Sequence, residues 1–251
     1  PPRSTLFPYT TLFRSIFCGR LHSDPAATVE EYAIRLVNLL QLYGVSPAQI
    51  EGGILGSVVP ALTGRVLDAL RMFCSARFLT VGPGLKSGIK LRLDNPAQLG
   101  AELLCGAVAA LEEGPGPLAV ISADTAISIM AVNGKQELVG GVILPGPQLS
   151  LSALVQKTAQ LPQIDLSAPA SSSILGKNTS ACLQNGFVLG TAGLLDGLAE
   201  RFQAELGPDI RFYATGNLPR TIREACRTPI EYREYLITDG LYRIWQKNRK
   251  G

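Results

Sequence analysis

A single carboxylate near the start of a predicted helix is the first residue in this sequence that could do chemistry. The stretch LDNPAQLGAELLC runs from Leu93 to Cys105, and Glu102 follows its turn residues. A carboxylate in that place can act as a general base that takes a proton from a substrate hydroxyl. It can equally be an ordinary first-turn residue, because negative charge near a helix N-terminus is stabilising by about 0.3–1 kcal/mol. The sequence favours this second, simpler interpretation.

Other apparent motifs do not indicate a site. GPGLKSG, at residues 82–88, lacks the glycine directly before Lys86 that a phosphate-binding P-loop requires. The lone histidine, His22, has no visible partner. The five cysteines are widely spaced, odd in number and without a CxxC pair, so they predict buried thiols rather than a zinc site or a disulfide framework.

The composition indicates a globular protein, which we expect to be cytoplasmic. The 251 residues are 46% hydrophobic, which is enough for a large core in one or two domains. The longest clean apolar run, Leu103–Leu111, is far shorter than the roughly 18 residues of a membrane span. The net charge is +3, and the basic cluster Lys247–Lys250 is expected to be a solvated tail. We therefore expect no membrane and no nucleic-acid partner.

The first fifteen residues look foreign to the rest of the sequence. The stretch Thr5–Ser15, TLFPYTTLFRS, resembles the translation of a short-read sequencing adapter and has neither helical nor strand periodicity. We interpret residues 1–15 as an assembly artefact and exclude them from fold reasoning. Re-sequencing of the parent locus should replace these codons, and their survival would reject this interpretation.

The remaining sequence alternates helices with strands. Apolar residues spaced at three and four predict a first helix that ends at Gly44. A β-α-β unit follows, with strands in GGILGSVVP and RFLTVG on either side of a helix near residues 61–74. The Ala-rich residues 100–114 predict another helix, which Gly114 closes.

A different pattern begins after Gly114. Strand-like runs surround the pair Asn133-Gly134, a strong hairpin signal, and predict a three-stranded meander. Beyond it we expect a helix at about residues 179–206, a strand in IRFYATG, and two more helices up to about Asn248. The predicted fold class is therefore α/β, with domains at residues 16–114 and 115–251.

The long predicted helix carries a row of glycines. Residue steps of four, four, three and four place the following residues on one face: Cys182, Gly186, Gly190, Gly193 and Gly197. Each interior glycine costs about 0.5–1 kcal/mol relative to alanine, so another backbone should approach closely there. That backbone belongs either to a second copy of the chain or to another helix of the same chain, and the sequence leaves both open.

An ordered set of short motifs carries a family resemblance. VGPGLKSGI, DNPAQLGA, GGVILPG, TAQLP, LGKNT and DGL occur in this order, and from about residue 16 to residue 248 the chain resembles type III pantothenate kinases. The resemblance implies two actin-like (ribonuclease H-like) α/β domains, the first lacking its N-terminal strands. It also implies ATP-dependent phosphorylation of pantothenate to 4′-phosphopantothenate in coenzyme A biosynthesis. The implied enzyme is a homodimer that needs Mg²⁺ and a monovalent cation, K⁺ or NH₄⁺.

The resemblance assigns the acidic helix start to the acceptor substrate. Gly100 and Ala101 match a substrate-binding Gly-Ala-Asp-Arg motif, whose Asp is the catalytic base. Glu102 stands for that Asp and reaches one methylene further, and a misplacement of about 1 Å can cost roughly a hundredfold in rate. Leu103 stands for the Arg and cannot supply its charged donors, a contact of about 1.5–3 kcal/mol.

The resemblance places a phosphate loop in VISADTAIS. Ser122 stands where the family has an Asp that binds the monovalent cation, so this metal ligand is expected to be lost. Asp124 replaces a glycine and puts negative charge beside phosphate oxygens, while Thr125 matches an ATP-binding residue. An ordinary strand and turn is the alternative that the sequence favours.

Further residues complete the implied site. Thr179, in LGKNT, matches a pantothenate-contacting Thr and is equally plausible as a helix cap or first-turn residue. Leu93 falls where the family often has a substrate-contacting Tyr. Gly216, in YATGN, matches an ATP-binding turn on the adenosine side, in which Asn217 replaces a second glycine. A plain turn is the alternative for this segment.

Two functions follow from these departures. The family's Asp-x-Gly-Asn-Thr loop, which holds phosphates and Mg²⁺, has no counterpart in this sequence. We therefore expect a pantothenate kinase-like protein in which this chain is impaired or inactive as an enzyme. The alternative is a non-catalytic paralogue, a dimeric binding or regulatory protein, since the family includes members named as transcription accessory factors.

Overall fold

The computed structural model describes residues 17–168, 170 and 173–249. The adapter-like residues 1–15 lie outside this range. Two compact units divide the chain, with the boundary between Val81 and Gly82. The domain division that the sequence predicts, between residues 114 and 115, is a different one and stays a prediction.

The first unit contains the predicted β-α-β arrangement. A capping box starts its first helix, because Thr28 Oγ1 accepts from the Glu31 backbone N–H and Glu31 accepts from the Thr28 N–H. The strands β1 and β2 pair in parallel, and a small core of Tyr32, Ala33 and Ala69 is buried between the helices. The elements are α1 (Val29–Leu42), η1 (Pro47–Gln49), β1 (Gly52–Leu55), α2 (Pro60–Phe73) and β2 (Arg77–Thr80).

The second unit is built on a six-stranded sheet with the order β3-β6-β5-β4-β7-β8. The central strands β4, β5 and β6 form the predicted antiparallel meander, and β7 adds in parallel to β4. The outer pairs β3–β6 and β7–β8 are also parallel. The strands are β3 (Lys90–Leu91), β4 (Leu118–Ala123), β5 (Ala126–Val132), β6 (Glu137–Pro145), β7 (Arg211–Gly216) and β8 (Ile230–Tyr232).

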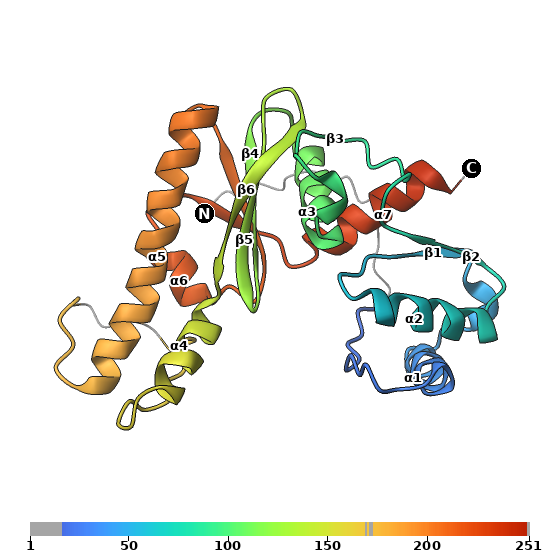
Figure 1. Ribbon diagram of the computed structural model, residues 1–251, viewed down its shortest axis with the longest axis horizontal. Coiled ribbons are helices and arrows are strands. Elements are labelled where there is room, and N and C mark those ends of the chain that lie inside the picture. The colour runs from blue at the N-terminus through green and yellow to red at the C-terminus, as the bar shows by residue number, and fades with distance from the viewer. Residues whose placement is uncertain (1–16, 169, 171–172, 250–251) are drawn as a thin grey trace, which may run out of the picture. The chain divides into compact units, whose positions relative to one another are not determined.

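Helices cover both faces of this sheet, as Figure 1 shows. The long helix α5 packs against one face through Val188, Ala192 and Leu195, which share a core with Ile121 of β4. The helices α3 and α7 lie on the other face (Figure 1). The helices are η2 (Pro96–Gln98), α3 (Ala101–Glu112), α4 (Pro147–Gln156), α5 (Thr179–Leu206), α6 (Arg220–Ala225) and α7 (Leu236–Asn248).

The structure confirms the α/β fold class and most of the predicted elements, and it adds others. The expected hairpin connects β5 to β6, but its positive φ falls on Gln136, at 59°, and not on Gly134. The elements that the sequence does not predict are β3, β8, α4 and the short 3-10 helices η1 and η2. Two- and three-residue strands are too short to show a period of two. The described helices include none that is both long and apolar enough to cross a membrane.

Candidate functional site

A cavity in the second unit brings together segments from distant parts of the sequence. Its volume is about 400 Å³. The walls come from the β4–β5 turn, the start of α4, the segment before α5 and the β7–α6 turn. The lining residues are Asp124, Thr125, Pro147, Gln148, Leu149, Ser152, Leu166, Asn217 and Pro219.

Hydrogen bonds join the β4–β5 turn, the β7–α6 turn and the start of α4 around this cavity. Asn217 Nδ2 donates to Asp124 Oδ1 at 2.7 Å, and the Asn217 backbone N–H donates to the Ala123 carbonyl at 2.5 Å. The Gly146 N–H, just before α4, donates to the Thr125 carbonyl at 2.8 Å. The β4–β5 turn is therefore tied both to the β7–α6 turn and to the start of α4.

Two glycines allow the turns to approach this closely. Gly216 has a φ of +83°, and a Cβ atom on it would lie 2.3 Å from the Ala123 carbonyl oxygen. A Cβ atom on Gly146 would lie 2.3 Å from the Asp124 carbonyl oxygen. Backbone atoms cannot yield to such contacts cheaply, so the geometry requires glycine at both positions.

A second layer of contacts supports the β7–α6 turn. The Tyr232 hydroxyl, at the end of β8, donates to the Gly216 carbonyl at 2.8 Å. The guanidinium carbon of Arg223 lies 3.9 Å from the centre of the Tyr232 ring, within the range of a cation–π contact. These contacts fix the carbonyl of Gly216, the residue before Asn217.

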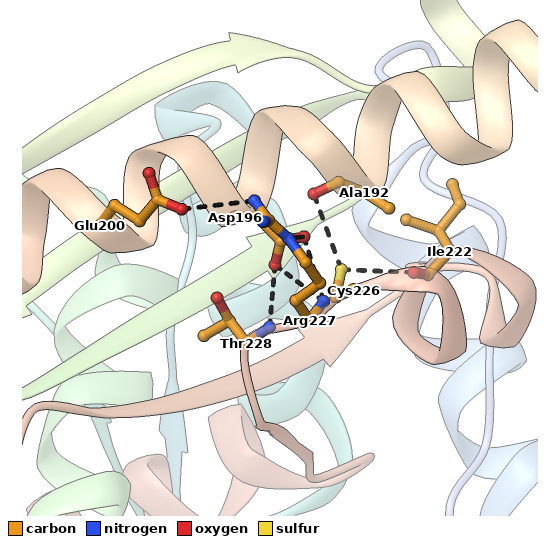
Figure 2. Close-up of polar contacts among 7 residues, drawn as sticks. All are labelled: Ala192, Asp196, Glu200, Ile222, Cys226, Arg227 and Thr228. Atoms are coloured by element: carbon orange, nitrogen blue, oxygen red, sulfur yellow. Dashed lines mark hydrogen bonds and ion pairs between the residues drawn. The ribbon is translucent and has the colours of Figure 1, made fainter.

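The loop that leads into β8 is held by a buried carboxylate. Figure 2 shows Asp196 of α5 accepting from the backbone N–H groups of Arg227 at 3.0 Å and of Thr228 at 2.9 Å. The Asp196 residue is 3% exposed. Burial on its own would raise the pKa of Asp196, but the hydrogen bonds from Thr228 and Arg227 outweigh burial and lower that pKa. Asp196 is thus ionised at neutral pH and positions the loop.

The start of α4 places the positive end of its helix dipole at the cavity. Gly146 is the N-cap and offers no side-chain acceptor, and the first-turn residues Pro147, Gln148 and Leu149 line the cavity. Backbone N–H groups at a helix start attract anions. The Asp124 carboxylate in the same cavity has the opposite charge, so the lining contains two opposing electrostatic effects.

The predicted substrate residues at the start of α3 lie in contrasting environments. Gly100 is the N-cap of α3, and Ala101 is buried at 7% exposure. Glu102 is exposed, whereas Leu103 is buried at 8% exposure. Leu103 is therefore a core residue, and its side chain offers a ligand no polar contact.

Ser122 lies on the sheet face that α3 covers. Ile121 and Ala123 point to the α5 core, so the alternate residues Val120 and Ser122 point to the opposite face. Ser122 pairs in register with Ser128 of β5 and Thr215 of β7, and these hydroxyl residues are 8%, 8% and 1% exposed. Ser122 thus belongs to a buried row of hydroxyls.

The α3 start and Ser122 lie toward the same end of the sheet. Arg211, at the start of β7, donates to the carbonyls of Gly114 and Pro115, just beyond α3. The C-terminal end of α3 is therefore beside the first residues of β4 and β7. It follows that Glu102 lies toward the strand ends at which Ser122 and Thr125 are found.

The other predicted contacts are not brought to the cavity. Thr179 is the exposed first residue of α5, and the cap is Asn178, whose Oδ1 accepts from the Ala181 N–H at 2.9 Å. Of the alternatives for Thr179, the structure excludes the cap. Leu93 is half-buried between β3 and η2. Neither residue lines the cavity.

Sequence reasoning missed the α4 wall of the cavity. The sequence does carry a signal for the start of α4: LPG at residues 144–146 is followed by Pro147, and proline is favoured at the first helical position. For metal ions, the described part of the chain has no group of three or more His, Cys, Asp or Glu placed to hold one.

Comparisons with known proteins agree on one family. A family model for type III pantothenate kinase matches residues 10–201. Type III pantothenate kinase of Geobacter sulfurreducens is 38% identical over 232 residues, covering 92% of this chain and 90% of the relative. That of Geotalea uraniireducens is 36% identical over 231 residues, with the same coverage. That of Koribacter versatilis is 36% identical over 239 residues, covering 95% and 86%.

Two solved structures are similar at a lower level. A protein described as a Baf family transcriptional activator from Campylobacter jejuni has a TM-score of 0.40 and 19% identity, covering 73% of this chain and 88% of its own. The activator of 2-hydroxyisocaproyl-CoA dehydratase from Clostridium difficile, with bound ADPNP, has a TM-score of 0.44 and 10% identity, covering 86% and 81%. At these scores neither structure supports an argument about this chain.

Proposed function

Because this chain belongs to the type III pantothenate kinase family, we propose that the cavity beside Asp124 and Asn217 is its nucleotide site. The observation that carries the proposal is the meeting of two segments. Thr125 lines the cavity, and Gly216 directly precedes Asn217, which lines it as well. These are the segments that the family resemblance assigned to ATP. The proposed reaction is ATP-dependent phosphorylation of pantothenate to 4′-phosphopantothenate.

We propose further that this chain carries out the reaction slowly. Phosphoryl transfer depends on positioning and on charge stabilisation. Leu103 is buried and apolar, so the start of α3 has no charged donor at that position for the pantothenate carboxylate. Glu102 replaces the Asp base with a side chain that is one methylene longer and exposed, and we propose that it does not act as the base. Substrate orientation and proton removal should both suffer, which supports low turnover rather than altered chemistry.

The monovalent cation that the resemblance implies does not match the residue present. Ser122 offers a neutral hydroxyl in a buried hydroxyl row, where a carboxylate would be needed to balance a monovalent cation. This position therefore supplies no charged ligand for K⁺ or NH₄⁺.

The experiment measures binding and turnover on the same protein. Calorimetry with adenosine and ATP tests the cavity, and ATP-dependent formation of phosphopantothenate tests catalysis. Gly216→Ala should weaken binding of both ligands at least about tenfold, because its Cβ would collide with the Ala123 carbonyl. Gly207→Ala is the matched control, since Gly207 also has positive φ, at 107°, but its Cβ would meet nothing within 4 Å.

The outcomes separate the two parts of the proposal. Equal loss of binding in both variants would contradict the placement of the nucleotide site. Turnover by the unchanged chain within tenfold of an ordinary family member would contradict the proposed impairment.

We also propose that the chain forms a homodimer through α5. Cβ atoms on Gly186, Gly190 and Gly193 would meet nothing within 4 Å among the described residues, so no described helix of the second unit packs on this face there. This open face supports the first of the two alternatives that the sequence left open, a second copy of the chain. This open face also supports the second candidate function, a dimeric binding or regulatory protein without kinase activity.

A further inference from the structure

The charge of the cavity depends on a single side chain. Among the described residues that line it, Asp124 is the only charged one. Its Oδ1 atom accepts from Asn217 Nδ2 at 2.7 Å. An amide is neutral, so this hydrogen bond orients the carboxylate without cancelling its charge.

The carboxylate is also held in place. Asn217 is fixed by its own N–H bond to the Ala123 carbonyl and follows Gly216, whose carbonyl accepts from the Tyr232 hydroxyl. Asp124 in turn donates its backbone N–H to the Ala126 carbonyl at 2.8 Å. The negative charge therefore cannot move away from the cavity without breaking the Asn217 contact.

The opposing positive charge is smaller. The start of α4 presents backbone N–H groups at Gln148 and Leu149, and a helix N-terminus is equivalent to roughly half a unit of positive charge. A carboxylate carries a full negative unit. The sum of these two charges is negative, and a negative cavity disfavours a ligand group with several negative charges.

The rest of the lining suits the uncharged part of a nucleotide. Pro147, Leu149, Leu166 and Pro219 offer apolar surface for a flat base. Thr125, Gln148 and Ser152 offer hydroxyl and amide groups that can bond to a ribose.

We propose that the clasp formed by Asp124 and Asn217 makes the cavity select against phosphate groups, so that it binds adenosine in preference to ATP. The inference rests on the proposed function, in which this cavity takes a nucleotide. It identifies Asp124 as the residue that determines the ligand class of the site.

The test compares adenosine and ATP by calorimetry at low salt without added divalent cation. Asp124→Asn keeps the side-chain shape and an oxygen that can accept from Asn217, but removes the charge. ATP affinity should rise about tenfold, the effect expected of one exposed charge beside several phosphate charges, and adenosine affinity should stay within about twofold. The rise should shrink at high salt.

Two more variants complete the test. Asp209→Asn removes an equal charge at an exposed residue just before β7, at the strand end opposite to the cavity, and should leave the ratio of the two affinities unchanged. Gln148→Lys adds a positive charge to the lining without touching the clasp, and should also raise ATP affinity. This variant keeps the inference testable if Asp124→Asn fails to fold.

Each result has a definite meaning. If adenosine and ATP both bind but neither Asp124→Asn nor Gln148→Lys changes the affinity ratio, the inference is overturned and the proposed nucleotide site stands. If no variant binds either ligand, the proposed nucleotide site is overturned, and the inference with it.

Discussion

Glu102 and Leu103 are neighbours in sequence whose surroundings assign them different roles. Glu102 is exposed in the first turn of α3, and Leu103 is 8% exposed in the core. A side chain that faces solvent at a helix start stabilises the helix through its charge alone. A base must in addition be held against a substrate hydroxyl.

Variants of Glu102 distinguish these roles. We expect Glu102→Gln to lower the free energy of unfolding by about 0.3–1 kcal/mol, because the helix dipole loses a favourable charge. Residual turnover should change by less than about twofold, since the proposed impairment leaves Glu102 without a catalytic role. Urea unfolding and phosphopantothenate formation measure the two effects.

Glu102→Asp is the control for the alternative role. It keeps the charge and shortens the side chain by one methylene. A rise in turnover of tenfold or more would show that the carboxylate is a working base held too far out, contrary to our expectation.

Gln136 is the described non-glycine residue with positive φ, at 59°, and it is exposed in the turn between β5 and β6. An L-residue in this left-handed region is strained by about 1 kcal/mol relative to glycine. Gln136→Gly should therefore raise the free energy of unfolding by about 0.5–1 kcal/mol. The urea midpoint measures the change.

Lys135→Gly is the matched control in the same turn. Lys135 is also exposed but has no positive φ, so glycine there brings only an entropic cost. If both glycine variants raised the free energy of unfolding, or if neither did, the result would contradict strain at Gln136.

At the scale of elements, the contact between α5 and the loop that leads into β8 depends on Asp196. Its buried carboxylate accepts the N–H groups of Arg227 and Thr228, as Figure 2 shows. Asp196→Asn should lower the free energy of unfolding at neutral pH by about 1.5–3 kcal/mol, because an amide nitrogen would face backbone donors. Glu200→Gln is the control: Glu200 pairs with the same Arg227 at 3.3 Å but is exposed, so its loss should cost less than about 0.5 kcal/mol.

The pH dependence of this effect has a definite sign. The folded state lowers the pKa of Asp196, so the stabilisation is fully present above the unfolded pKa, which is about 3.9 for an Asp. It is lost as the pH falls through the lower, folded pKa. The difference between the unchanged chain and Asp196→Asn should thus be constant from about pH 5 to pH 8 and shrink below about pH 4. A difference that grew on acidification would contradict this assignment.

Periodicity predicted the longer elements well. The α5 prediction of residues 179–206 coincides with the observed helix Thr179–Leu206, because its buried positions recur every three or four residues. The helix α4 escaped prediction since PQLSLSALVQ mixes apolar and polar residues without a clear stripe, and only Pro147 and Leu151 are buried in it.

The site was harder to predict than the fold for a physical reason. In the sequence, Asp124 and Asn217 are separate features, a repulsive charge and a mild turn substitution. The hydrogen bond that joins them spans 93 residues and depends on the parallel pairing of β4 with β7. No local pattern encodes such a contact, so the cavity and its clasp become visible only when the sheet is assembled.

At the scale of the whole molecule, the surface of α5 opposite its core raises the question of assembly. The helix has 28 residues and is therefore about 42 Å long, enough to contribute much of the roughly 800 Å² per partner of a standard interface. One face is buried in the core through Val188, Ala192 and Leu195. The other exposes Gly190 and Leu194, the latter at 43%.

Packing of two copies across this exposed face of α5 can be tested by substitution. If two copies of α5 pack across their glycines, Gly190→Leu places a bulky side chain where the backbones meet and should convert dimers to monomers. Sedimentation equilibrium at micromolar concentration should then show at least a tenfold higher dissociation constant. Gly64→Leu is the matched control, since Gly64 is an exposed helical glycine of α2 whose Cβ would also meet nothing within 4 Å. A dimer that is unchanged by Gly190→Leu, or an unchanged chain that is already monomeric, would reject the α5 interface and remove the support that it gives to a dimeric regulatory role.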